Sequence, residues 1–132
     1  MAPELSEQQI ADLRKHLQNR LQNLREEIRE ELLRYDDEQY LELAGRVHDS
    51  EDESVADLLV DLNLAGINRH IRELREIDGA LLRIARGLYG LCADCEAPIE
   101  YQRLLAWPTA QRCHRCQEIY EKTHAHEGHA SL

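Results

Sequence analysis

The apolar residues of the first 44 positions recur with the period of an α-helix. They cover 25 residues in seven steps, or about 3.6 residues per step. Ser6 and Gln9 form a capping-box pair, which starts a helix, and no glycine or proline occurs between Pro3 and Gly45. The pattern predicts one helix from about residue 7 to 44. Its apolar stripe consists of Ile10, Leu13, Leu17, Leu21, Leu24, Ile28, Leu32 and Tyr35.

A second apolar stripe follows a break at residues 45–54. Gly45 is expected to end the first helix in the left-handed conformation, and Asp52 or Ser54 to cap the next one. The second stripe covers 28 residues in eight steps, about 3.5 per step, which is typical of a coiled-coil seam. It predicts a helix from about 55 to 88. The stripe consists of Val60, Leu64, Ile67, Ile71, Leu74, Ile77, Leu81, Ile84 and Leu88.

Two long helices joined by about ten residues are expected to pack antiparallel, since neither can bury its apolar stripe alone. The predicted fold class is therefore mostly α. A long antiparallel helical hairpin (a coiled coil) occupies residues 1–86, with its tip at about 45–54, and a small module with a C-terminal helix occupies 87–132. Within that module, residues 100–104 are expected to form a short strand pair or turn, and the last helix to run from near His114 to Lys122.

All four cysteines fall in two C-x-x-C pairs, Cys92 with Cys95 and Cys113 with Cys116. Such pairs present four thiolates to one tetrahedral Zn²⁺, with bonds of about 2.3 Å. Because the protein fills all four positions, the pattern indicates one structural zinc rather than a catalytic one. A redox dithiol pair and disulfides are the alternatives. Disulfides are disfavoured because no secretory signal precedes the cysteines.

The charge balance narrows the choice of partner. The formal net charge is −10, charged residues reach 32% and aromatic residues 5%. Such a surface is repelled by DNA, whose affinity for proteins comes largely from phosphate neutralisation, so a protein with a basic surface is the expected partner. No apolar run suits a membrane span, and the sequence predicts a cytoplasmic protein. It shows no phosphate loop, Ser-His-Asp layout or open metal site, so no enzymatic activity is expected.

One stretch of the chain carries a family resemblance. From Gly87 it reads Gly-Leu-Tyr-Gly-Leu-Cys-Ala-Asp-Cys, followed by Ile99, Arg103, Leu104, Ala106, Pro108 and the pair Cys113 and Cys116. In these residues the chain resembles the DksA/TraR zinc-finger family over about 87–117. Members of that family bind bacterial RNA polymerase directly and insert an acidic coiled-coil tip through its secondary channel, without contacting DNA. The resemblance implies a transcription regulator of this kind, which is expected to act as a monomer.

The resemblance also assigns the residues of the tip. The family's tip motif is Asp-x-x-Asp-x-Ala, and Asp49, Asp52 and Ser54 stand at its three defined positions here. Asp52 precedes Cys92 by forty residues, which fits the family layout. These three residues are therefore the predicted polymerase-contacting tip, with Ser54 in place of the family's alanine. The alternative is a solvated loop whose acidic residues only cap helices.

A further departure concerns the nucleotide ppGpp. Several basic positions that DksA-type proteins use for ppGpp appear here as Glu76, Trp107 and Gln117, while Arg69 is retained. Because a polyanion needs cationic partners, little or no ppGpp binding is expected. The competing function is a zinc-containing interaction adaptor, or a redox or zinc sensor, that dimerises through the hairpin.

Overall fold

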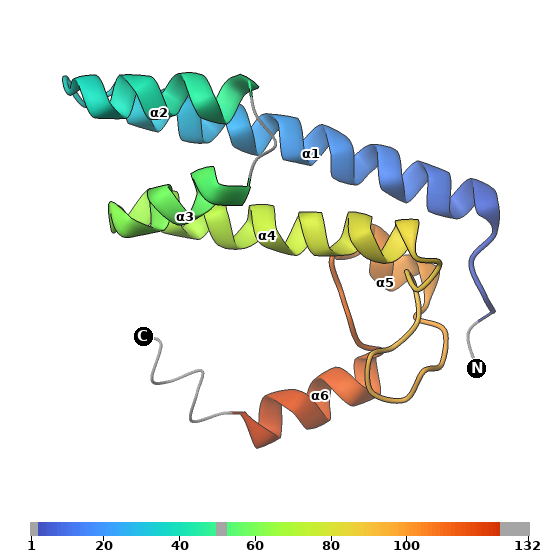
Figure 1. Cartoon of the computed structure of the whole chain (residues 1–132). Coiled ribbons are helices and arrows are strands. Elements are labelled where there is room, and N and C mark those ends of the chain that lie inside the picture. The colour runs from blue at the N-terminus through green and yellow to red at the C-terminus, as the bar shows by residue number, and fades with distance from the viewer. Residues whose placement is uncertain (1–2, 50–52, 125–132) are drawn as a thin grey trace. The chain divides into compact units, whose positions relative to one another are not determined.

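The computed structural model describes residues 3–49 and 53–124 (Figure 1). Within these ranges the chain forms helices and one isolated bridge between Leu91 and Pro98, but no strand. This confirms the mostly α fold with an antiparallel helical hairpin. None of the helices in the described part is long and apolar enough to span a membrane. The helices are α1 (Glu7–Leu33), α2 (Glu38–Asp49), α3 (Glu53–Asp61), α4 (Ala65–Ala85), α5 (Tyr101–Ala106) and α6 (His114–Thr123).

The first helix starts as predicted but ends early. At its start the Gln9 amide donates to Ser6 Oγ at 3.1 Å, and the Ser6 amide donates to Gln9 Oε1 at 2.9 Å. The predicted helix 7–44 is wrong at its far end, because α1 stops at Leu33 and α2 begins at Glu38. Asp37 causes the restart: its Oδ1 accepts from the Gln39 amide at 2.8 Å, which is an N-cap.

Gly45 does not end a helix, contrary to the prediction. It lies inside α2, which continues to Asp49. Glycine in a helix interior costs about 1 kcal/mol relative to alanine. Its neighbours Ala44 and Val47 are buried, and burial of this α2 face outweighs the local cost.

The predicted second helix 55–88 is likewise two helices, α3 and α4. Asn63 separates them with φ of 53°, a left-handed conformation that asparagine tolerates better than most residues. At its other end, α4 closes in a Schellman motif around Gly87, whose φ is 72°. The Leu88 amide donates to Arg83 O at 2.8 Å, and the Gly87 amide donates to Ile84 O at 3.1 Å.

The chain divides into two compact units, one of residues 15–79 and one that combines residues 1–14 with 80–132. In the first unit α1 and α4 run antiparallel. Arg20 on α1 bonds Glu73 on α4 at 3.0 Å, while His70 lies 3.6 Å from Glu27 and 3.9 Å from Glu31. Residue numbers therefore increase along α1 as they decrease along the facing side of α4, which is the antiparallel arrangement.

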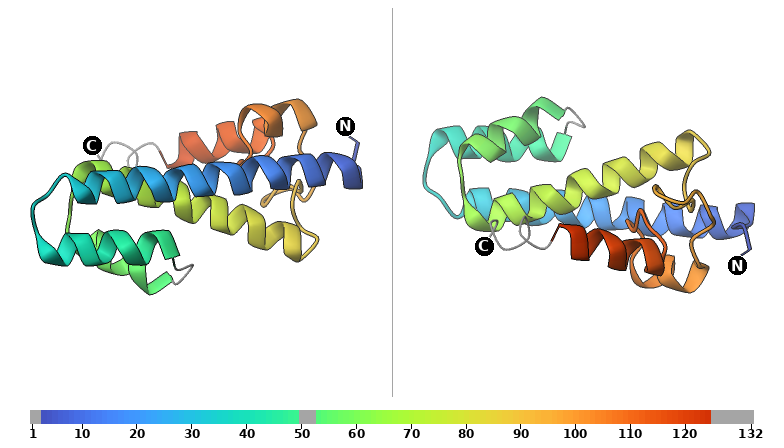
Figure 2. Two further views of the ribbon diagram at one scale, coloured as in Figure 1. Left: turned by 90° about the horizontal axis from the view of Figure 1, so that it is seen from above. Right: turned by 90° about the horizontal axis from the view of Figure 1, so that it is seen from below.

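Helices α2 and α3 fold back against this pair within the same unit. The two views of Figure 2 show α2 and α3 side by side, joined to α1 and α4 at their outer ends. All four helices contribute to one apolar cluster, so the turns after α1 and before α4 reverse the chain. The buried members of the cluster are Ile28, Leu32, Leu43, Ala44, Val47, Val55, Leu59, Ile67 and Ile71.

Candidate metal centre

The first C-x-x-C pair is held in a tight turn of the backbone. The Glu96 amide donates to Cys92 O at 3.0 Å, and Glu96 itself is left-handed with φ of 64°. The Cys92 amide donates to Ala97 O at 2.8 Å, next to the Leu91–Pro98 bridge. These bonds reverse the chain between Cys92 and Cys95, so both sulfurs face the same point.

The second pair uses a helix start instead of a turn. Cys113 is the N-cap of α6, and its Sγ accepts from the Cys116 amide at 3.5 Å. The first turn of α6 then places Cys116 Sγ on the same side as Cys113 Sγ. The Ala93 amide donates to Gln111 O at 2.8 Å, which ties the first turn to the segment that leads into α6.

The four sulfurs meet the geometric requirement of a zinc site. All lie within 4.8 Å of one another, and Cys95 Sγ is 3.9 Å from Cys113 Sγ. Four sulfurs at about 2.3 Å from one tetrahedral zinc are roughly 3.8 Å apart. The cysteines are therefore positioned to bind one metal ion. His114 is directed elsewhere, because its Nε2 lies 3.0 Å from the Glu118 carboxylate.

Without metal, the thiols of Cys92 and Cys116 have very different pKa values. Burial acts to raise the pKa of Cys92, but the backbone amides of Cys95, Cys113 and Asp94 outweigh it and lower that pKa to about 6. A hydrogen bond with Cys113, together with burial, raises the pKa of Cys116 to about 12. Zinc bound by four thiolates displaces the remaining protons, so its affinity falls as the pH falls.

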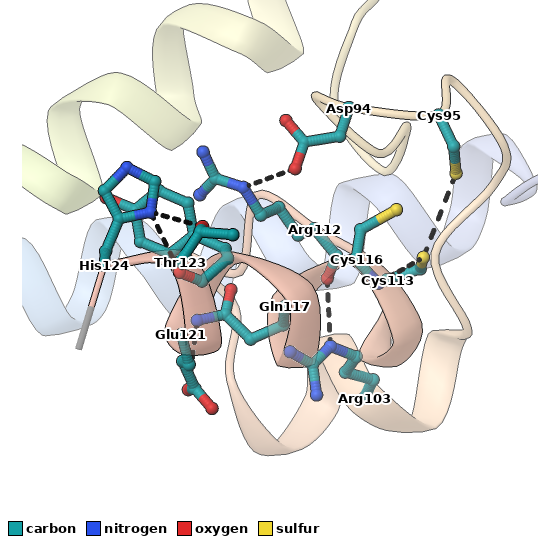
Figure 3. A network of polar contacts seen from close by, with 11 residues as sticks. Asp94, Cys95, Arg103, Arg112, Cys113, Cys116, Gln117, Glu121, Thr123 and His124 are labelled. Carbon is teal, nitrogen blue, oxygen red and sulfur yellow. Dashed lines mark hydrogen bonds and ion pairs between the residues drawn. The ribbon is translucent and has the colours of Figure 1, made fainter.

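Charged side chains brace the two cysteine turns against each other (Figure 3). Arg112 Nε donates to Asp94 Oδ2 at 2.9 Å, and its guanidinium lies 3.9 Å from the centre of the Tyr120 ring. Arg103 Nε donates to Arg112 O at 3.0 Å, and its guanidinium lies over Trp107. Two arginines thus link the first turn, α5 and α6. Sequence reasoning missed the role of Asp94, for which its position inside a C-x-x-C pair was the available signal.

The module also packs on the end of α4 and on the N-terminal segment. Tyr89 is 6% exposed, and its hydroxyl donates to Pro108 O at 2.7 Å. Gly90 has φ of 85°, and a Cβ there would lie 2.8 Å from Leu5 Cδ1. Leu5 therefore packs against the backbone of Gly90, two residues before Cys92. Residues 101–106 form α5, so the predicted strand pair or turn is wrong, while the C-terminal helix from His114 is confirmed as α6.

Because the Tyr89 hydroxyl is buried, the free energy of unfolding is expected to decrease at alkaline pH. Burial raises its pKa to about 12, with the Arg83 guanidinium opposing the shift. An unfolded tyrosine ionises near 10. Stability is therefore full below pH 10 and falls as the pH rises to 12, by about 2 kcal/mol for a shift of this size. Urea unfolding followed by Trp107 fluorescence measures this change.

A phenylalanine variant separates the ionisation from general alkaline damage. Tyr89→Phe is expected to cost about 1 kcal/mol at pH 8, because Pro108 O loses its donor, and to remove the decline between pH 10 and 12. Tyr101→Phe in the same unit is the matched control and keeps the decline. A Tyr89→Phe variant with the parent's alkaline profile contradicts the assignment.

The predicted tip is only partly visible in the structure. Asp52 lies outside the described residues. The backbones of Asp49 and Ser54 are described, at the last position of α2 and the second position of α3, but their side chains are not. The tip assignment therefore stays a prediction.

Comparison with known proteins identifies the centre. The profile of the prokaryotic dksA/traR C4-type zinc finger matches residues 87–122, which contain both cysteine pairs. The structure of transcription factor DksA2 from Pseudomonas aeruginosa is similar to 91% of this chain and 88% of that chain, with a TM-score of 0.60 and 30% identity. The chain belongs to the DksA/TraR family. Its cofactor is one zinc ion, as the cysteine spacing predicted.

Two further relatives match part of the chain. An uncharacterized protein of Aquifex aeolicus is 44% identical over 55 residues, which are 42% of this chain and 38% of that protein. An 8.2 kDa protein in the gpA 5′ region of Escherichia phage P2 is 35% identical over 52 residues, or 39% of this chain and 70% of that protein. The chain thus spans well under half of the Aquifex protein. DksA/TraR membership rests on the zinc finger and on the similarity to DksA2.

Proposed function

We propose that this chain regulates bacterial transcription by binding RNA polymerase directly. Cys92, Cys95, Cys113 and Cys116 hold one structural zinc, and the segment from Asp49 to Ser54 enters the secondary channel of the polymerase. The chain acts as a monomer, does not read DNA sequence and is not an enzyme. The observation that carries this proposal is the similarity to transcription factor DksA2 over nine-tenths of the chain, zinc finger included.

The charge of the helices next to the proposed tip supports a basic partner. Helices α2 and α3 together contain six acidic residues and one arginine, Arg46. Carboxylates attract a basic channel over roughly one Debye length, about 8 Å at physiological salt. The same charge repels DNA phosphates, which agrees with action through the polymerase.

The residues at two of the altered positions near the zinc module support the expectation of little or no ppGpp binding. Gln117 donates to the Glu121 carboxylate at 3.2 Å, and Trp107 lies beside Arg103. Neither position supplies a cation. The proposed activity therefore does not depend on ppGpp bound to this protein. Isothermal titration is expected to show no binding at micromolar ppGpp, and micromolar affinity contradicts this part of the proposal.

A pull-down with the zinc-loaded full chain and core RNA polymerase tests the proposal directly. We expect one chain per polymerase, and competition by a factor that occupies the secondary channel. Light scattering on the chain alone is expected to give a monomer. Failure to bind polymerase, together with an obligate dimer, favours the adaptor function instead.

The proposed tip predicts a separation of binding from activity. Replacing Asp49 and Asp52 together by asparagine is expected to abolish the effect on transcription in vitro. Polymerase binding is expected to weaken by no more than about threefold, because most of the contact surface remains. The matched control is Glu30→Gln with Asp36→Asn, which removes the same charge from exposed positions of the same unit. Unchanged transcription in the Asp49 and Asp52 variant contradicts the tip assignment.

A further inference from the structure

Helices α2 and α3 leave a groove open along one edge of their contact. It lies wholly within the 15–79 unit and has a volume of about 310 Å³. Its apolar lining comes from Leu43 on α2 and from Leu58 and Leu62 on α3. Leu43 is nearly buried, whereas Leu58 is 41% exposed. The groove thus has an apolar base that the chain itself does not fully cover.

The polar lining of the groove contains two carboxylates, one guanidinium and one amide. Gln39, Glu42 and Arg46 line it from α2, and Asp61 lines it from α3. Glu42 and Arg46 are four residues apart, and Asp61 is three residues after Leu58, so each set lies on one face of its helix. Over both helices the sequence has six acidic residues against one arginine. An apolar base between acidic helices complements a ligand that is both apolar and cationic.

The size of the groove limits what it can take. Pockets for organic ligands measure about 300–1,000 Å³, and this groove is at the small end of that range. It therefore accommodates a few aliphatic side chains rather than a whole domain. An amphipathic helix presents such side chains one turn apart, with its charged residues at the margins.

We propose that the α2–α3 groove binds a short basic amphipathic helix of a partner protein. The aliphatic side chains of that helix pack against Leu43, Leu58 and Leu62, and its lysines or arginines lie beside Glu42 and Asp61. This inference goes beyond the proposed function, because it concerns a surface of α2 and α3 rather than the Asp49–Ser54 segment. It is tested without polymerase, so the two proposals can fail separately.

The test uses a fluorescein-labelled 15-residue leucine–lysine peptide of helical period and the zinc-loaded full chain. Fluorescence anisotropy is expected to show binding that weakens with salt, and no binding of a leucine–glutamate peptide with the same apolar pattern. Leu58→Gln is expected to weaken binding about tenfold, and Asp61→Asn about threefold. Val60→Gln is the matched control, because Val60 is 39% exposed on the same helix but does not line the groove.

Three results overturn the proposal. One is equal weakening by Leu58→Gln and Val60→Gln, which places the peptide elsewhere on the acidic surface. Another is equal binding of both peptides. The third is a dimer of the chain alone that Leu58→Gln dissociates, which makes a second copy the occupant. If circular dichroism shows that Leu58→Gln is unfolded, Asp61→Asn compared with Glu30→Gln decides, and equal affinities for that pair overturn the proposal.

Discussion

Removing zinc is expected to unfold the segment from about residue 87 to 124 while the helices of the 15–79 unit remain folded. Structural zinc contributes about 10–16 kcal/mol in isolated zinc-finger peptides. The segment has few other sources of stability, because α5 and α6 are short and its described part buries few residues. These are Tyr89, Gly90, Cys92, Ile99, Leu104, Ala110 and Cys116. A core of this size does not hold a fold without a metal or a crosslink.

Two signals distinguish the units in this experiment. Trp107 is the single tryptophan and lies in the zinc module, so its fluorescence reports that module alone. Treatment with a chelator is expected to change the Trp107 emission, while most of the helical signal in circular dichroism remains. Cys92→Ser is expected to reproduce the effect. Ala93→Ser, at an exposed position of the same turn, is expected to leave the Trp107 emission unchanged. An unchanged Trp107 signal after measured zinc loss contradicts a folding role for the metal.

The zinc centre was the part of the structure that the sequence determined best. A C-x-x-C pair is a local feature, and its geometry follows from bonds between residues only a few positions apart. The side-chain contacts around the centre were harder to predict from the sequence. Asp94 and Arg112 are eighteen positions apart, and their ion pair exists only because the Ala93 amide bonds Gln111 O and aligns the two segments.

The helix breaks show why periodicity alone misplaced the elements. Tyr35 continues the apolar stripe of α1, so the stripe gave no sign that α1 ends at Leu33. The break comes from the N-cap at Asp37 and from Asn63, which are single polar residues within otherwise regular patterns. Their effect depends on burial elsewhere: α2 and α3 gain an apolar contact with α1 and α4 by folding back, which two uninterrupted helices do not make.

That fold-back contact is expected to be essential for the 15–79 unit, and Leu59→Ala tests it. Leu59 is 2% exposed and belongs to the cluster shared by α1, α2, α3 and α4. Truncating a buried leucine to alanine costs about 2–5 kcal/mol. A unit of this size has a total stability of about 3–10 kcal/mol. The variant is therefore expected to lose about a fifth or more of the free energy of unfolding, measured by urea titration monitored by circular dichroism.

The neighbouring residue provides the control. Leu58→Ala is expected to lower the free energy of unfolding by less than about 1 kcal/mol, because Leu58 is 41% exposed and is not among the buried members of the cluster. Equal losses for the two variants contradict the fold-back packing. Under the proposed function, Leu59→Ala also weakens the transcriptional effect at 37 °C although it leaves every carboxylate in place. The reason is that Val47 and Val55, which precede and follow the proposed tip in the sequence, pack in the same cluster as Leu59.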